Sequence, residues 1–293
     1  MTQHVRGPVV AGVDGSDSAL DAVRWAAVEA RRHGASLRLV NACPWPQLHY
    51  GAAVLGVEYR EAFLGMAQEQ LDAAAAQAAE AAPGVEVEED VVVSFAEPVL
   101  VDESKRARLV VVGDRGVGRL TGVLVGSVAS ALVARGECPV VVVRGAARPR
   151  PDAPVVVGID GAPDSEAAIA FAFDAAAARG VGLVAVLTWR DEFGELPIRA
   201  FLDWEATMER EREVLAERLA GWSEKYPQVP VRRVVTEDRP VRRLLAEAQD
   251  AQLLVLGSRG HGAVAGLLLG SVSHAVLHQA PCPVAVVRPV VQR

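Results

Sequence analysis

The fold is decided by a stretch that occurs twice in the chain. Residues Leu109–Ser127 read LVVVGDRGVGRLTGVLVGS, and residues Leu253–Ser271 read LLVLGSRGHGAVAGLLLGS. In each copy a short aliphatic run predicts a buried strand, and a glycine follows it directly. A strand that ends in glycine lets the backbone turn sharply and approach a bulky group, because no Cβ stands in the way. Each copy therefore predicts a buried strand that leads into a ligand-sized loop.

The rest of the chain repeats in the same order. The segment PVVAGVDG at 8–15 matches PVVVGIDG at 154–161, and CPVVVVRG at 138–145 matches CPVAVVRP at 282–289. A length of 293 residues also exceeds the roughly 100–200 residues of an ordinary domain. We expect one domain at residues 1–146 and a second at residues 154–293. The proline-rich residues 147–153 form the linker between them.

Within each copy, aliphatic runs alternate with alanine-rich segments whose spacing suits helices. In the first copy the expected helices are 18–34, 61–84, 97–107 and 127–137. Glycines stand where three of these helices should end, at Gly34, Gly84 and Gly136. Strands that are apolar on both sides and alternate with helices predict an α/β fold with a parallel sheet covered on both faces. Ligands of such sheets lie beyond the carboxyl ends of the strands.

Composition excludes several classes of protein. The formal net charge of −7 argues against a broad surface for nucleic acid or acidic lipid. Three cysteines without a C-x-x-C pair fit a reducing compartment. The apolar stretches are interrupted by Gly, Ser and Thr and are too short to span a membrane. Since no secretory signal is visible either, we expect a cytoplasmic protein without a nucleic-acid or membrane partner.

The repeated stretch has the spacing G-x2-G-x9-G-S in both copies. Ser127 and Ser271 open the last expected helix of each copy, and serine is a favoured N-cap residue. Backbone amides at a helix start attract phosphate. A phosphate chain between the glycines would therefore meet N–H groups from both sides. The alternative is that the glycines make tight turns and the serines only cap helices.

Charged residues follow the same strand ends. Asp14 and Asp160 end the first strand of each copy, where a carboxylate could bind a ribose hydroxyl or a metal-bound water. Asp before Gly is also an ordinary turn residue. Arg115, Arg119 and Arg259 could neutralise phosphate charge. No residue is assigned as catalytic or as a metal ligand.

These motifs resemble universal stress protein domains, whose ATP-binding members carry the G-x2-G-x9-G-[ST] pattern with a V-D-G or I-D-G strand ending. The resemblance implies two Rossmann-like (adenine nucleotide alpha hydrolase-like) domains, each a five-stranded parallel sheet with helices on both faces. It further implies ATP with Mg²⁺ as cofactors, a role in stress response, and a homodimer or domain pair formed through the last strands. The protein partner that would be regulated is unknown.

The resemblance also implies the residues that bind the cofactor. They are Gly12, Asp14, Gly113, Asp114, Arg115, Gly116, Gly118, Gly126, Ser127 and Val128 in the first copy, and Gly158, Asp160, Gly257, Ser258, Arg259, Gly260, Gly262, Gly270, Ser271 and Val272 in the second. Asp114 departs from the pattern, because the second copy has Ser258 there. A carboxylate beside a phosphate costs binding unless it points away or meets Mg²⁺.

The sequence bears on three other functions. A P-loop enzyme is excluded because the two lysines, Lys105 and Lys225, are not part of a G-K-[ST] motif. An AMP-forming ATP pyrophosphatase remains an alternative, although Asp14 and Asp160 stand where its loop needs glycine. An interaction module with vestigial pockets is the third. Glutamate at Gly113 or Gly257 is expected to abolish ATP binding at its own site and to leave the fold intact.

Overall fold

The computed structural model describes residues 7–44, 57–116, 125–144, 150–162, 165–189, 204–258 and 269–289. The chain divides into two compact units, Met1–Arg144 and Gly145–Arg293. We call them the first unit and the second unit and describe each by itself. Gly118, Arg119, Arg259, Gly260 and Gly262 lie outside the described residues.

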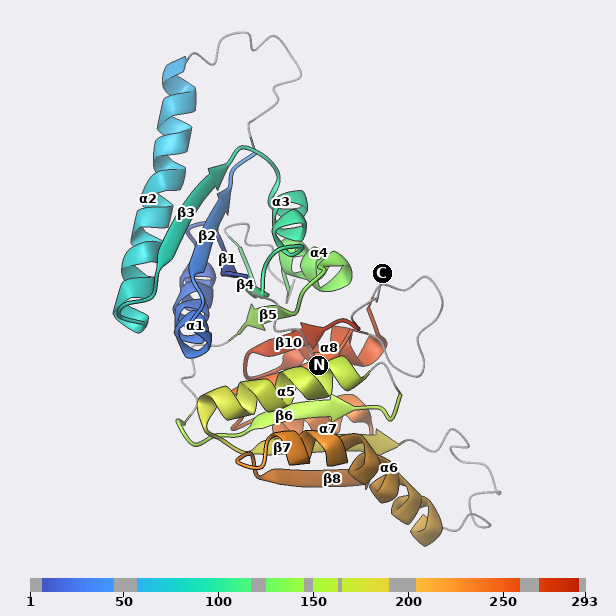
Figure 1. Ribbon diagram of the computed structural model, residues 1–293. Helices are drawn as coiled ribbons and strands as arrows, with labels where there is room; N and C mark the ends of the chain where they lie inside the picture. The colour runs from blue at the N-terminus through green and yellow to red at the C-terminus, as the bar shows by residue number, and fades with distance from the viewer. Residues whose placement is uncertain are drawn as a thin grey trace. The chain divides into compact units, whose positions relative to one another are not determined.

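The first unit is a five-stranded parallel sheet in the order β3-β2-β1-β4-β5 (Figure 1). Its strands are β1 (Val9–Val13), β2 (Leu37–Ala42), β3 (Val87–Val92), β4 (Leu109–Gly113) and β5 (Val140–Val143). Its helices are α1 (Asp17–His33), α2 (Val57–Ala81), α3 (Ala96–Glu103) and α4 (Ser127–Arg135). The pair α1 and α2 covers one face of the sheet, and the pair α3 and α4 covers the other.

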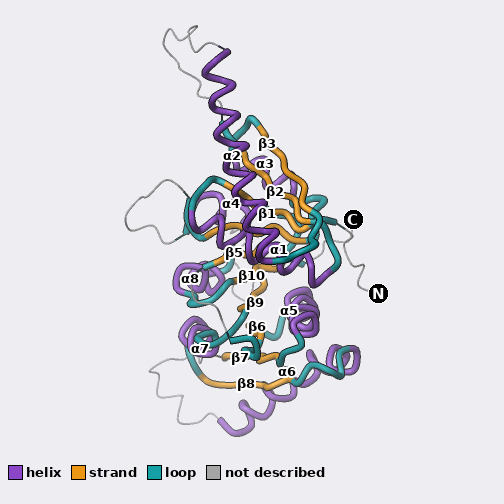
Figure 2. Tube along the Cα trace, turned by 90° about the vertical axis from the view of Figure 1, so that its left-hand side faces the viewer, coloured by secondary structure: helices purple, strands orange, loops and turns teal. Residues whose placement is uncertain are grey.

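The second unit repeats this architecture with the strand order β10-β9-β6-β7-β8, again all parallel. Its strands are β6 (Val155–Ile159), β7 (Leu183–Trp189), β8 (Val231–Glu237), β9 (Leu253–Gly257) and β10 (Val284–Val287). Its helices are α5 (Glu166–Arg179), α6 (Trp204–Lys225), α7 (Pro240–Glu247) and α8 (Ser271–Gln279). Helices α5 and α6 lie on one side of the strands and α7 and α8 on the other (Figure 2). The expected α/β fold is confirmed in both units.

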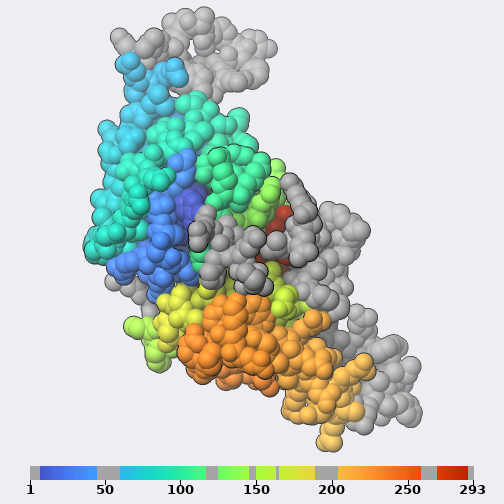
Figure 3. Space-filling model, in the orientation of Figure 1, coloured from blue at the N-terminus to red at the C-terminus, as the bar shows by residue number. Residues whose placement is uncertain are grey.

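Burial explains why these segments fold as they do. All four residues of β5 are buried, as are the first four of β4, because helices cover both sides of these strands. The alanine-rich α2 buries Ala67, Leu71, Ala74 and Ala78, a spacing of three and four residues that keeps one face on the sheet. Its other face lies at the surface, light blue in Figure 3.

Two of the three expected helix stops depend on a left-handed backbone. Gly34 caps α1 with φ 59° and donates its N–H to carbonyls of the last turn, and Gly84 has φ 86° after the end of α2. Gly136 differs, since its φ is −59°. A Cβ at Gly136 would lie 2.7 Å from the Leu132 carbonyl oxygen, so glycine is needed there for close approach and not for handedness.

The cysteines belong to the core. Cys43, Cys138 and Cys282 are buried free thiols. Burial raises the pKa of the Cys138 and Cys282 thiols to about 12, so both stay protonated and unreactive at neutral pH. The helices in the described part of the chain do not combine the length and the apolar character that a membrane span needs.

The contrast between two glycines of the first unit gives a stability test. Replacing Gly34 by Ala should lower the free energy of unfolding by roughly 1 kcal/mol, because L-residues are disfavoured at its positive φ. Gly65→Ala, in the middle of α2 with open space around it, should instead raise that free energy by about 0.5 kcal/mol. Urea unfolding of both variants checks the signs. Two changes of the same sign would contradict this account of the caps.

Candidate functional site

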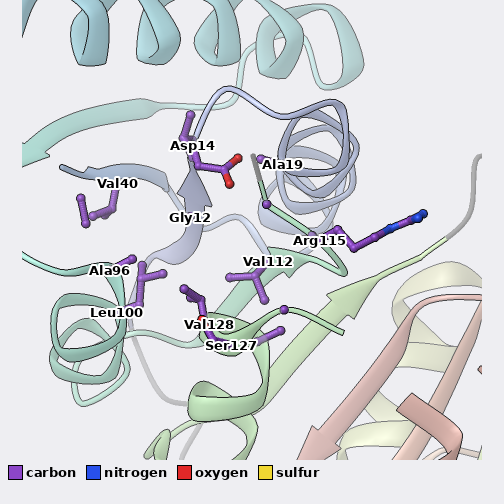
Figure 4. Close-up of a pocket in the computed structure, with 16 residues that line it drawn as sticks. Gly12, Asp14, Ala19, Val40, Ala96, Leu100, Val112, Arg115, Ser127 and Val128 are labelled. Carbon is purple, nitrogen blue, oxygen red and sulfur yellow. The ribbon is translucent and has the colours of Figure 1, made fainter. Parts of the chain in front are cut away.

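A cavity of about 250 Å³ opens at the carboxyl ends of β1 and β4. These neighbouring strands connect to opposite sides of the sheet, which is where open α/β sheets form their ligand crevices. Figure 4 shows the cavity between β1, α3 and the start of α4. Its lining residues are Gly12, Val13, Asp14, Ala19, Val40, Ala42, Ala96, Leu100, Val112, Gly113, Arg115, Gly116, Gly126, Ser127, Val128 and Ala129.

Two glycines are required by close packing at the end of β4. A Cβ at Gly113 would lie 2.4 Å from Ser18 Oγ and 2.7 Å from the Ser18 carbonyl carbon and oxygen. A Cβ at Gly116 would lie 2.6 Å from Asp14 Oδ2. The strand end and its loop therefore pass directly against the first turn of α1 and the end of β1. The expectation that glutamate at Gly113 leaves the fold intact is wrong for this reason, because the clash involves backbone atoms.

The start of α4 differs from the sequence expectation. Its N-cap is Gly126, not Ser127, and the helix start has no side-chain cap hydrogen bond. Ser127 is instead the first helical residue and is exposed at the cavity. The amides of Ser127, Val128 and Ala129 have no acceptor within the helix, since the first N–H groups of a helix never do. These three cavity-lining residues present an uncapped, partially positive helix start.

The carboxylate of Asp14 has a structural task. Its Oδ1 accepts hydrogen bonds from the Ser16 N–H at 3.0 Å and from the Ser16 hydroxyl at 2.6 Å. Gly15, between them, has φ 81°. In the second unit Asp160 Oδ1 accepts from the Ala162 N–H at 3.0 Å in the same way. Both aspartates thus form the turn after the first strand, and Asp14 also lines the cavity.

Asp114 is not among the residues that line the cavity. Its side chain is 6% exposed, and its Oδ1 accepts a hydrogen bond from the Ser18 hydroxyl at 2.8 Å. The Nε atoms of Arg115 and Arg144 lie 3.4 and 3.7 Å from Oδ2. Burial lowers the pKa of the Arg144 guanidinium, and the Asp114 carboxylate opposes that shift. The charge that departs from the family pattern is therefore neutralised within the protein.

Arg115 lines the cavity and is 70% exposed. In Figure 4 its side chain extends away from the apolar wall formed by Val40 and Leu100. A ligand whose apolar part rests on that wall would carry its charged part toward Arg115 and the start of α4. Among the lining residues Arg115 is the only cation.

The apolar wall was missed by the sequence motif. It consists of Val13, Ala19, Val40, Ala42, Ala96, Leu100, Val112 and Ala129. These residues come from the ends of β1, β2 and β4 and from α1, α3 and α4, so no local spacing connects them. The signal that could have found them is strand register: Gly12 pairs with Val40, and Ala42 lies two residues further on the same face.

The second unit places the counterpart residues in the same backbone frame. The Gly270 N–H donates to the Ser258 carbonyl at 2.9 Å, as Gly126 does to Asp114 at 2.8 Å. Gly270 is the N-cap of α8, so Ser271 was also wrongly expected to be the cap. Gly158 and Gly257 lie in β6 and β9, and Val272 in the first turn of α8.

The lining residues of this cavity do not form a set of ligands for a resident metal ion. Among the lining residues Asp14 is the only carboxylate. The described residues contain no group of three or more His, Cys, Asp or Glu side chains that could hold a metal. Mg²⁺ commonly binds through one or two carboxylates together with the phosphates of a nucleotide. The arrangement fits an ion that would arrive with a nucleotide, with Asp14 beside it.

Comparison with known proteins identifies relatives over the whole chain. The model of the universal stress protein family matches residues 6–144 and 153–288. Universal stress protein Rv2005c of Mycobacterium tuberculosis is 44% identical over 297 residues, which cover 96% of each chain. The crystal structure of a universal stress protein from Archaeoglobus fulgidus has a TM-score of 0.70 at 18% identity and covers 97% of this chain and 99% of its own.

A further Archaeoglobus fulgidus universal stress protein was solved in complex with dAMP. It is 26% identical, covers 48% of this chain and 99% of its own, and has a TM-score of 0.36.

The packing at the strand end predicts different tolerances for two lining glycines. Gly113→Ala should lower the free energy of unfolding by about 2 kcal/mol or more, because Ser18 must move. Gly126→Ala should cost only about 0.5 kcal/mol, since its φ of −68° suits any residue and its nearest neighbour would be 3.7 Å away. Urea unfolding measures both. Equal losses would show that β4 does not approach α1 as described.

Proposed function

This chain belongs to the universal stress protein family, and on that premise we propose that its first unit binds an adenine nucleotide, ATP, in the cavity at the ends of β1 and β4. The observation that carries the proposal is the joining of two chemically different halves in one cavity. One half is apolar, and the other half consists of the glycine-containing loop after β4 and the uncapped start of α4.

The phosphate half uses backbone groups. The amides of Ser127, Val128 and Ala129 supply donors, and the glycines at 113, 116 and 126 keep side chains out of the path of a phosphate chain. Arg115 adds a positive charge at the rim. A lysine, which P-loop enzymes require, is not needed for this mode of binding.

The apolar half suits a flat base. Val40, Leu100 and Val112 offer branched side chains, while Ala42 and Ala96 leave room between them. Small-molecule pockets are lined in this way, with few polar groups, and usually measure about 300–1,000 Å³. The cavity of about 250 Å³ lies just below that range. We place the adenine and ribose inside it, with the phosphates at the rim.

Binding is favoured over turnover. Asp14 is the only lining carboxylate, and its Oδ1 is engaged by Ser16, so we assign no general base. Mg²⁺ would accompany the triphosphate and offset its charge. Slow hydrolysis, and the alternative of AMP-forming pyrophosphatase chemistry, are tested by measuring release of phosphate, AMP and pyrophosphate. A vestigial pocket is tested by the calorimetry below.

The wider role is part of the proposal. We propose a cytoplasmic stress-response regulator in which ATP occupancy changes the contacts between domains or subunits. The three buried free thiols fit a reducing compartment. The homodimer expected from the sequence stays a prediction that light scattering can test, and the regulated partner is unknown.

Calorimetric titration of the full chain tests the site. Gly126→Glu should reduce the number of ATP molecules bound by one per chain, with affinity at the first unit falling about 100-fold or more, because a carboxylate would stand among the phosphates. Gly126 has the space and the backbone angles to accept a side chain, so the fold should persist.

Gly65→Glu is the matched control. It makes the same change on α2, where nothing lies within 4 Å of the new Cβ, and should bind ATP as the parent does. A folded Gly126→Glu variant with unchanged ATP stoichiometry and affinity would remove the proposed site.

A further inference from the structure

Each unit has an outer strand whose far side pairs with no other described strand. Among the described residues β3 pairs only with β2, and β8 pairs only with β7 (Figure 1). An outer strand presents a row of free N–H and C=O groups, which is a template for pairing with another chain. We call these two strands the β3 edge, residues 87–92, and the β8 edge, residues 231–237.

The backbone hydrogen bonds show which residues present the free groups. The Glu86 carbonyl accepts from the Leu37 N–H of β2, and the Pro230 carbonyl accepts from the Leu183 N–H of β7. Every second residue from there points toward the neighbouring strand, because successive residues of a strand direct their backbone groups to alternate sides. The residues that point outward are Val87, Glu89 and Val91 on the β3 edge, and Val231, Arg233 and Val235 on the β8 edge. Each edge thus has one charged residue between two valines.

The two central residues carry opposite charges that are not neutralised within the described part of the chain. Glu89 is exposed and accepts a hydrogen bond from the Gln68 side chain of α2 at 2.8 Å. Arg233 is also exposed, and its side chain makes no hydrogen bond with a described residue. Neither Glu89 nor Arg233 forms an ion pair with a described residue. Both charges are therefore available to a partner that approaches the edge.

The opposite face of each edge repeats the difference in charge. On the β3 edge Glu88 and Asp90 lie beside Arg38 of β2, whose Nη2 is 2.6 Å from Asp90 Oδ2. On the β8 edge Arg232 pairs with Glu247 of α7. The side chains of Asp90 and Arg232 are 38% and 57% exposed, so these charges too can be reached from outside. The β3 edge is acidic on both faces, and the β8 edge carries arginine on both.

One antiparallel register matches the two edges along their length. It pairs Glu89 with Arg233, Asp90 with Arg232, Val87 with Val235 and Val91 with Val231. Residues that lie directly opposite each other and point toward the partner strand exchange both of their N–H···O bonds. Opposite charges and branched side chains that face each other across such a pair stabilise it further. The β3 edge and the β8 edge are therefore complementary in backbone and in charge.

The same charges oppose the pairing of like edges. Two β3 edges in the equivalent register would place Glu89 against its own copy and Glu88 against Asp90. Two β8 edges would place Arg233 against its own copy. Like charges directly opposite each other destabilise a sheet. The charges thus favour the mixed pair and disfavour both self-pairs, which is how specificity between similar surfaces is obtained.

From this complementarity we infer that copies of the chain associate head to tail, with the β3 edge of one copy pairing in antiparallel orientation with the β8 edge of the next. The partner is a second copy, because the complementary edge is part of the same sequence. Each copy keeps one further edge of each kind, so the contact is heterologous and can continue to further copies. The contact is separate from the homodimer expected through the last strands, and it uses no residue that lines the nucleotide cavity.

Exchanging the two central charges tests the contact by light scattering of the full chain at low salt. The average mass of the parent should rise with protein concentration and fall when salt is added, because salt screens exposed charges. Arg233→Glu and Glu89→Arg should each weaken the association about tenfold, because each variant places like charges opposite each other. An equimolar mixture of the two variants should associate as the parent does, since each variant then meets an opposite charge on the other. The double variant should also associate.

Arg106→Glu is the matched control for Arg233→Glu. It makes the same change of charge at a side chain that is 78% exposed after the end of α3, and it should associate as the parent does. Circular dichroism checks that every variant is folded. A parent that keeps one mass at all concentrations, single variants that associate like the parent, or a mixture that does not associate would each overturn the inference. ATP binding by the same samples is measured separately, so failure of this contact and failure of the proposed function are distinguishable.

Discussion

The site depends on a single constraint, which is how closely the end of β4 passes the first turn of α1. At Gly113 a side-chain carbon fits only if Ser18 shifts, because Ser18 backbone atoms lie 2.7 Å from its place. This contact brings the loop after β4 against Asp14, and the Gly126 N–H then bonds to the Asp114 carbonyl at 2.8 Å. The start of α4 is thereby fixed at the rim. The cavity lies beside the end of β4 and the start of α4. Both segments carry glycines there, so the polar half of the cavity consists of backbone amides.

The contact between the end of β4 and the first turn of α1 also includes a hydrogen bond from Ser18 to Asp114. Asp114 is buried with two arginines beside it, and it does not line the cavity. The family pattern alone made this residue an objection to phosphate binding in the first unit. The structure removes the objection, since this carboxylate is not among the lining residues and is engaged by Ser18 and by the two arginines.

Much of the fold could be predicted from the sequence, because short stretches of residues indicate both the buried strands and the duplication. The strand Val140–Val143 and its repeat are apolar on both sides, so both faces of their sheet must be covered. Alternation with alanine-rich helices then favours a parallel sheet between two layers of helices. The glycine loop was found for the same reason. The N-caps were misplaced by one residue. Serine propensity favours Ser127 as the cap, whereas the helix begins one residue after Gly126, whose backbone is extended and whose N–H bonds to the Asp114 carbonyl. The apolar wall was missed because Val40, Ala96 and Val112 meet only through the sheet order. The segments at 45–56 and 190–203 lie outside the described residues.

The central claim is that main-chain amides at the start of α4 hold the phosphates of a nucleotide. Amide hydrogen exchange followed by NMR measures this directly, because those amides have no acceptor in the helix and exchange quickly when unprotected. The account predicts that ATP slows exchange at Ser127, Val128 and Ala129. The amide of Ser130, which already bonds to the Gly126 carbonyl, serves as internal reference. Saturating ATP that leaves all three amides exchanging at their original rates would contradict it.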